Sequence, residues 1–140
     1  MKITLTKLSK PALSGIADLV EMYQKRLRPL TKFETVVQKA DASTLRSQPG
    51  HCLVLLDERG KQFTSHQLAL KFTELSENPA IKSVQIVVGG PYGFEDIDRA
   101  KADWLWSLSP LTLQGDIAWL IAAEQIYRTF TILNKIPYHH

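Results

Sequence analysis

Two groups of residues in this chain have the types and the spacing that chemistry requires. The first is Gly89-Gly90-Pro91-Tyr92-Gly93, where glycines let main-chain N–H and C=O groups approach a ligand closely. It matches neither a dinucleotide-binding fingerprint nor a Walker loop, and a tight turn would use the same residues. The second group is the end of the chain, Tyr138, His139 and His140, whose side chains are of types used in acid–base chemistry, while by composition alone a frayed chain end is the expected interpretation.

Other kinds of site are not predicted. The four histidines have no accompanying cluster of carboxylates or cysteines, so no metal site is expected. No G-x-S-x-G sequence occurs, which disfavours a serine hydrolase. The single cysteine, Cys52, stands in an apolar run and is interpreted as a buried small side chain. Asp57 and Glu58 follow that run and are interpreted as a turn at the end of a strand.

Composition and charge set wide limits on the function. With 140 residues, 44% hydrophobic and 22% charged, the chain is expected to form one globular domain, residues 1–140. No apolar run approaches the roughly 20 residues of a membrane span, and the N-terminus lacks the apolar core of a signal peptide. We therefore expect a cytoplasmic protein without membrane contact. The net charge of +3 permits an RNA partner without requiring one.

Hydrophobic periodicity predicts the elements that position these groups. Strands are expected at 2–8, 33–37, 51–56, 84–88 and 104–108. Helices are expected from Pro11 to Leu27, from a Ser65 cap to about Asn78, over 95–102, and from an Asp116 cap through 117–133. Residues 40–50 are expected to form a loop with at most one helical turn, and residues 57–60 a turn.

Alternating strands and helices predict an α/β domain with a mostly parallel sheet flanked by helices. Ligands of such sheets bind outside the carboxyl ends of the strands, which here are followed by residues 57–61, 89–94 and 109–115. The last helix is apolar on more than one face, which indicates burial on several sides and an oligomer interface. Lys25, Arg26, Arg28 and Lys32 cluster at the end of the first helix and fit a solvated face or an RNA contact equally well.

Five motifs in chain order together resemble the ribosomal RNA large-subunit methyltransferase H family. They are a strand ending Leu56-Asp57, the segment Val87 to Gly93, Trp106-Ser107-Leu108-Ser109-Pro110-Leu111-Thr112-Leu113, Ala123-Glu124-Gln125-Ile126-Tyr127-Arg128, and Asn134 to His139. Each motif is weak alone, but their order and the position of the last one at the chain end are specific. The resemblance covers nearly the whole chain.

The resemblance implies a SPOUT-type α/β fold with a C-terminal trefoil knot and a homodimer formed through the last helix. It implies methyl transfer from S-adenosylmethionine to ring nitrogen 3 of a pseudouridine in large-subunit ribosomal RNA, with the ribosome as partner. Matched residue by residue, the methyl donor is expected at Leu56, Gly89, Leu108, Ser109, Pro110, Leu111, Thr112 and Leu113. The tail residues Tyr138, His139 and His140 are expected to act on the target base, in one subunit or across the dimer.

Some positions differ from the pattern of the family. Gln114-Gly115 stands where the family usually has Pro-His, and Ala118 or Trp119 stands where an arginine is common. Two alternatives therefore stay open beside the methyltransferase. One is a catalytically degenerate member of the same fold that binds RNA or the ribosome. The other is a generic nucleotide-binding α/β domain.

Overall fold

The computed structural model describes all 140 residues and contains one five-stranded sheet with the order β2-β1-β4-β3-β5. Every strand pair in it is parallel, so the predicted sheet type is confirmed. The strands are β1 (Lys2–Lys7), β2 (Lys32–Val37), β3 (His51–Gln62), β4 (Ser83–Val88) and β5 (Trp104–Ser107). Because all strands run the same way, the loops that follow them gather at one edge of the sheet.

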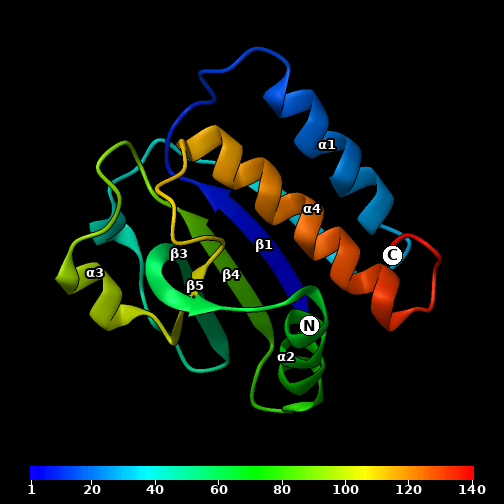
Figure 1. The fold of residues 1–140 in the computed structure, drawn as a ribbon. Helices are drawn as coiled ribbons and strands as arrows, with labels where there is room; N and C mark the ends of the chain where they lie inside the picture. The colour runs from blue at the N-terminus through cyan, green and yellow to red at the C-terminus, as the bar shows by residue number, and fades with distance from the viewer.

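Helices cover both faces of the sheet (Figure 1). The helices are α1 (Ile16–Leu27), α2 (Ser65–Glu77), α3 (Asp96–Lys101) and α4 (Gly115–Leu133), with a short 3-10 helix, η1 (Ala42–Thr44). Buried side chains of α1, α2 and α4 share one hydrophobic cluster with the sheet. A smaller cluster on the other face includes residues beside η1 and α3. The result is a three-layer α/β domain.

The first helix begins later than the sequence predicts. Pro11 does not open it, because the helix starts at Ile16 and is preceded by Gly15 with a φ of 81°. Residues 11–15 instead form a connection whose main-chain N–H groups at Ala12 and Leu13 donate to the Asp116 carboxylate. Helix α2 is capped one residue earlier than predicted, by Thr64, which forms a capping box with Gln67.

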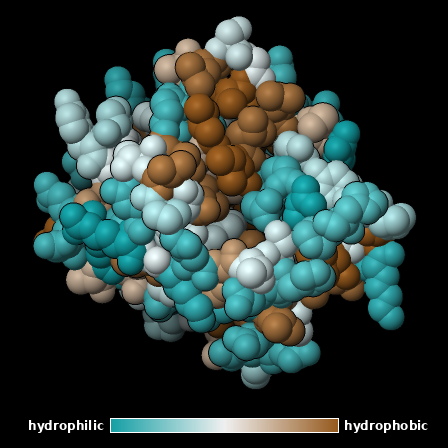
Figure 2. All heavy atoms as spheres, viewed as in Figure 1, coloured by the Kyte–Doolittle hydropathy of each residue, from teal (hydrophilic) through white to brown (hydrophobic).

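The cap of α4 is also not the predicted one. Gln114 takes that place, because its Oε1 accepts hydrogen bonds from the N–H groups of Asp116 (2.7 Å) and Ile117 (3.1 Å). The apolar faces of α4 pack on the sheet and against α1 and α2. Contacts within one chain therefore explain why most of the apolar residues of this helix are apolar. Ile117 remains 42% exposed, beside a surface of α1 and α4 where apolar atoms gather (Figure 2).

Strand β3 is longer than predicted, because residues 57–60 interrupt it rather than end it. β3 pairs with β5 at Val54–Leu56, and pairs with it again at Lys61 and Gln62. The four intervening residues loop out towards the ligand edge of the sheet. Gly60 allows this detour, since a Cβ there would lie 2.5 Å from the main-chain carbon of Leu105.

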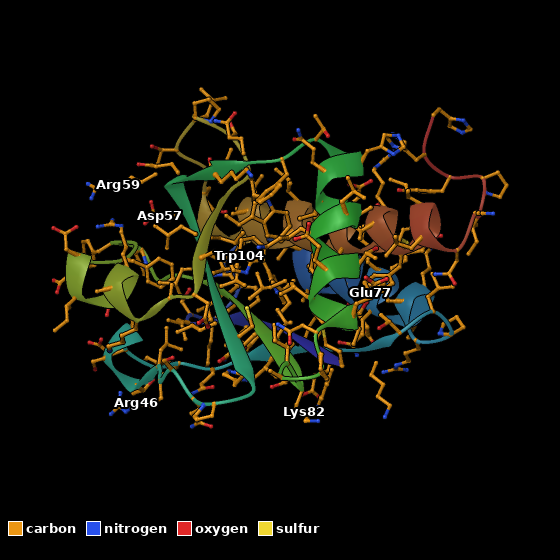
Figure 3. The ribbon with its side chains drawn as sticks, turned by 90° about the horizontal axis from the view of Figure 1, so that it is seen from below. Arg46, Asp57, Arg59, Glu77, Lys82 and Trp104 are labelled. Carbon is orange, nitrogen blue, oxygen red and sulfur yellow. The ribbon has the colours of Figure 1, made fainter.

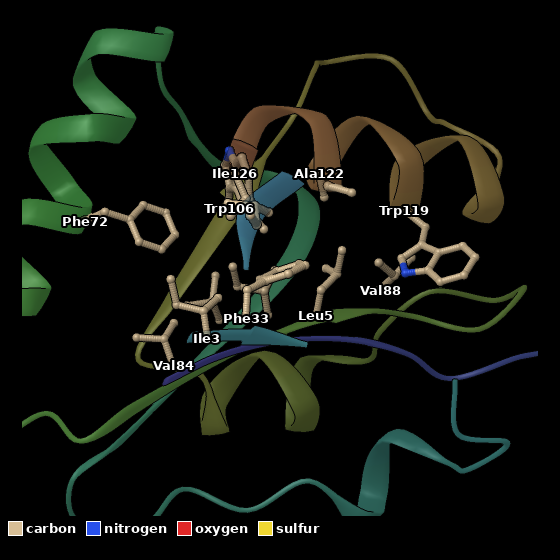
Figure 4. Packing of buried hydrophobic residues seen from close by; sticks show 14 of the residues in the cluster. Ile3, Leu5, Phe33, Phe72, Val84, Val88, Trp106, Trp119, Ala122 and Ile126 are labelled. Carbon is tan, nitrogen blue, oxygen red and sulfur yellow. The ribbon is translucent and has the colours of Figure 1, made fainter. Parts of the chain in front are cut away.

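The core between the helices and the sheet is aromatic and aliphatic (Figure 4). Phe72 of α2 and Trp119 of α4 point into it, and they are 1% and 3% exposed. Phe72 meets Phe130 edge to face, with ring centroids 5.9 Å apart. Cys52 is buried as predicted, and burial raises the pKa of its thiol. The core therefore fixes α4, whose first turn forms one wall of the candidate site.

Candidate active site

A cleft of about 830 Å³ lies at the carboxyl ends of the strands. Its walls come from the connection after β1, the loop-out of β3, the glycine-rich loop after β4 and the residues before α4. This volume lies within the range of small-molecule sites in proteins. The edge of the sheet that the sequence predicted as the site is thus the edge that carries the cleft.

An apolar hollow of about 90 Å³ adjoins the cleft. Six of its eight lining residues are apolar: the four leucines Leu56, Leu108, Leu111 and Leu113, with Trp106 and Ala118. The other two are acidic, Asp57 and Glu58. Leu56 and Leu113 also line the larger cleft, so the two spaces share a wall. Such a surface fits a flat, uncharged ring such as an adenine.

Six of the eight residues expected at the methyl donor line these two spaces. Gly89 and Thr112 line the cleft, and the four leucines named above line the hollow. Ser109 and Pro110 line neither space. The Ser109 hydroxyl accepts a hydrogen bond from the N–H of Leu111 at 2.9 Å, so it shapes the turn that presents the leucines.

Residues 109–113 form no backbone–backbone hydrogen bonds. The N–H groups of Thr112 and Leu113 are therefore open to a ligand, beside an apolar surface. Unpaired main-chain donors of this kind are normally satisfied by a partner. The side chain of Thr112 is already engaged, since its hydroxyl donates to Glu58 at 3.0 Å and ties this loop to the loop-out of β3.

Close neighbours leave little room for any side chain at Gly89. A Cβ there would lie 3.2 Å from the ring of Phe94 and 3.3 Å from the main chain of Gly93. A side chain at Gly89 would therefore push the glycine-rich loop away from β4 and alter the cleft. Tyr92, at the tip of the same loop, is fully exposed.

Asp57 and Arg99 form an ion pair in the lining of the cleft. The Arg99 Nε donates to Asp57 Oδ2 at 2.7 Å, and another guanidinium nitrogen donates to the Phe94 carbonyl at 2.6 Å. The Asp57 side chain is 6% exposed. Its hydrogen bond is the main cause that raises the pKa of Arg99. The sequence interpretation of Asp57 as only a turn residue missed this role, because Arg99 lies 42 residues further along the chain.

Lys7 and Asp116 form a buried ion pair in the cleft wall, which sequence analysis also missed. One signal could have found it. Lys7 shares the alternating face of β1 with Ile3 and Leu5, and a lysine on a buried face needs a partner. Burial opposes ionisation of Asp116, but hydrogen bonds from Leu13 and Ala12 and the charge of Lys7 outweigh it and lower the pKa.

The tail lies at the opposite end of α4 from the cleft (Figures 1 and 3). Helix α4 has 19 residues and is therefore about 28 Å long, at about 1.5 Å per residue. The Tyr138 hydroxyl donates to Glu124 at 3.1 Å, and Glu124 also pairs with Arg128 at 2.6 Å. Within one chain, the predicted tail residues and the predicted donor residues are therefore not brought together.

His139 lies between α4 and α2. An Arg128 guanidinium nitrogen is 3.0 Å from His139 Nδ1, and the His66 ring meets the His139 ring edge to face at 4.9 Å. Because a guanidinium can only donate, the His139 Nδ1 accepts this hydrogen bond. Burial, helped by Tyr23 and Glu124, raises the pKa of Tyr138 to about 12. His140 is exposed and makes none of these contacts.

No group of three or more His, Cys, Asp or Glu side chains could hold a metal ion. None of the helices combines the length and the apolar character that crossing a membrane requires.

The parallel sheet with a cleft at its carboxyl edge places the protein among the α/β ligand-binding domains. Comparison with known proteins identifies the family. Residues 1–139 match the family described as "Predicted SPOUT methyltransferase". The chain therefore belongs to the SPOUT methyltransferases. Within them it belongs to the ribosomal RNA large subunit methyltransferase H family, as full-length relatives show.

Two relatives named Ribosomal RNA large subunit methyltransferase H illustrate the similarity. The protein from Parabacteroides distasonis is 37% identical over 157 residues, covering 100% of this chain and 99% of the relative. The protein from Thermus thermophilus is 34% identical over 139 residues, covering 99% and 98%. The resemblance that the five motifs predicted is therefore confirmed.

Solved structures agree at the level of the fold. A probable methylase family protein from Haemophilus influenzae has a TM-score of 0.58 at 10% identity, covering 95% of this chain and 66% of that chain. A probable methyltransferase from Bordetella pertussis has a TM-score of 0.55 at 12% identity, covering 92% and 93%.

Proposed function

We propose that this protein transfers a methyl group from S-adenosylmethionine to ring nitrogen 3 of a pseudouridine in large-subunit ribosomal RNA. One observation carries the proposal: residues from three separate loops, with free main-chain donors and an apolar hollow, line adjoining spaces at the carboxyl edge of the sheet. Membership of the family supports the same reaction.

The methyl donor fits the residues that are present. Leu56, Leu108 and Leu111 would cover its adenine in the hollow, and the N–H groups of Thr112 and Leu113 would hydrogen-bond to it. Gly89 would let the main chain approach closely. The rest of the cleft, which holds Lys7, Ser9 and Lys10, would receive the target nucleotide.

The tail would act across a homodimer. Two copies packed antiparallel along α4 would bring the tail of each beside the cleft of the other, because tail and cleft lie at opposite ends of that helix. The exposed apolar side chains available for this contact include Leu13 (42% exposed), Leu19 (45%) and Ile117 (42%). Leu120 and Ile121 of α4 are half-buried beside them.

When bound, S-adenosylmethionine supplies an electrophilic methyl group on a sulfonium sulfur. The residues of the chain hold the pseudouridine so that its nitrogen 3 faces this methyl, which supplies much of the acceleration. In place of its hydrogen bond from Arg128, the His139 Nδ1 of one subunit would accept the proton of nitrogen 3. The electron pair left on nitrogen 3 would then take up the methyl group, whose former bonding pair would stay with the donor sulfur. Tyr138 keeps its proton near neutral pH and donates it to Glu124, so its hydroxyl oxygen would accept a hydrogen bond from the base.

We further propose that the C-terminal half forms the trefoil knot of its family. Two observations support it: β5 is paired on both sides of the loop-out at residues 57–60, and Thr112, after β5, binds Glu58 within that loop-out. The chain beyond β5 is thus in direct contact with the loop-out of β3. A crystal structure traced through residues 57–115 would test the knot.

Calorimetry and mass spectrometry test the function. We expect S-adenosylmethionine and its demethylated product to bind, and methyl-pseudouridine to appear in ribosomes from cells that lack the gene after incubation with the protein. Absence of donor binding would favour the alternative, a degenerate member that binds RNA only. Donor binding without any new methyl-pseudouridine would exclude the proposed substrate.

Variants of the tail separate the two halves of the site. His139→Ala should reduce turnover by about a hundredfold, within the range for loss of a general base, and leave donor affinity nearly unchanged. Tyr138→Phe should reduce turnover less. Glu77→Gln, an exposed change on α2, is the matched control. Unchanged turnover in both tail variants would remove the proposed role of the tail.

A further inference from the structure

A basic surface lies at the end of α1, beside the tail. We define the α1 basic patch as Lys25, Arg26, Arg28 and Lys32. All four side chains are exposed. Helices α1 and α4 pack side by side, and their C-terminal ends lie at the same end of the molecule (Figure 1). The patch is therefore at the tail end of α4 and away from the cleft of its own chain.

The charge of this patch is largely uncompensated. Arg26, Arg28 and Lys32 form no salt bridge, and Lys25 pairs only with Glu21, at 3.5 Å between two exposed side chains. Exposed pairs of this kind contribute little and are screened by salt. The nearest acid of α4, Glu124, is already occupied by Arg128 and Tyr138.

Aromatic rings join the patch to the tail. The Arg26 guanidinium carbon lies 5.8 Å from the ring centroids of both Tyr23 and Tyr127. Tyr127 in turn meets Tyr138 edge to face at 4.8 Å. A guanidinium that lies on aromatic faces is already ordered, so less side-chain entropy is lost when it binds a ligand. Its N–H groups stay available at the edge of the plane, where they can bind a phosphate in a bidentate manner.

We infer that the α1 basic patch binds the sugar–phosphate backbone of the substrate RNA next to the target nucleotide. This inference rests on the proposed function, because in the proposed dimer the tail of one protomer serves the cleft of its partner. The patch continues from that tail, so it borders the site where the pseudouridine is methylated. Arg26, which lies over two tyrosine rings beside a base-binding site, matches RNA better than a membrane, which would need apolar side chains in the same patch.

The test replaces Arg26 and Arg28 together by Gln. We expect the affinity for a ribosomal RNA fragment to fall by roughly tenfold at moderate salt. The slope of log K against the logarithm of the salt concentration should become shallower by about one for each phosphate contact that is lost. The KM for the ribosomal substrate should rise while kcat and donor affinity stay unchanged. Circular dichroism melting checks that the variant is folded.

A variant with the same loss of charge elsewhere is the control. Arg46→Gln with Lys61→Gln removes two exposed charges outside the patch. Lys61 lies on β3 where it pairs with β5, at the side of the sheet opposite to β2, where Lys32 lies. Equal weakening by both double variants, or none by the patch variant, would overturn the inference. So would loss of binding to phosphatidylserine vesicles with RNA binding intact. Failure of this inference can be distinguished from failure of the proposed function, because RNA binding is measured without the methyl donor and donor binding is measured without RNA.

Discussion

The ammonium group of Lys7 lies 3.1 Å from the carboxylate of Asp116, and these side chains are only 3% and 1% exposed. The pair joins the end of β1 to the first turn of α4. The other carboxylate oxygen of Asp116 accepts main-chain hydrogen bonds from Ala12 and Leu13, both at 2.7 Å. One carboxylate therefore fixes three segments that border the cleft.

Removal of this carboxylate should strongly destabilise the fold. Asp116→Leu leaves the Lys7 charge buried without an ionic partner, with only the Ser9 hydroxyl to accept from it, which costs about 3–5 kcal/mol of unfolding free energy. Urea denaturation measures it. The double variant Lys7→Met with Asp116→Leu removes both charges and should recover part of the loss. A single variant as stable as the parent would show that the pair is not a structural support.

Replacement of Gly60 by alanine should also destabilise the protein. The new Cβ would lie 2.5 Å from main-chain atoms of Leu105, which cannot move aside as a flexible side chain could. We expect a loss of about 1–3 kcal/mol, the usual cost of overpacking, measured by thermal and urea unfolding. Gly90→Ala is the control, because a Cβ there meets no atom within 4 Å. Equal stability of the two variants would contradict the close approach.

Arg99→Gln should weaken binding of the methyl donor. Without the guanidinium, Asp57 and the Phe94 carbonyl lose the group that holds them together, and the glycine-rich loop loses its support. We expect roughly tenfold weaker binding by calorimetry, since a hydrogen bond to a charged group is worth about 1.5–3 kcal/mol. Arg46→Gln removes an exposed arginine that lines neither the cleft nor the hollow and should have little effect. Donor affinity equal to that of the parent would refute the role of Arg99.

The raised pKa of Tyr138 predicts a stability change in alkali. The folded state holds the proton more tightly, with a pKa of about 12 against an ordinary 10.0. This contribution to stability is complete below pH 10 and is lost as the pH rises through about 12. The unfolding free energy of the parent should therefore approach that of Tyr138→Phe between these values. A difference that widens with pH would have the wrong sign.

The strands and loops were predictable because they depend on neighbouring residues. The apolar runs at 51–56 and 84–88 specify buried parallel strands, and parallel strands place the segments after Leu56, Val88 and Ser107 at one edge. The family motifs added the residues that line the cleft and hollow. These features follow from local periodicity and from one general rule of α/β sheets.

The sequence by itself determined the fold class, the family and the edge of the sheet that carries the cleft. The tertiary structure alone decided that Asp116 holds Ala12, 104 residues away, rather than capping α4. It also decided that β3 resumes after residues 57–60 and that the tail lies at the far end of α4 from the cleft. Periodicity is set by the local geometry of helix and strand, whereas contacts between distant segments depend on how the layers pack.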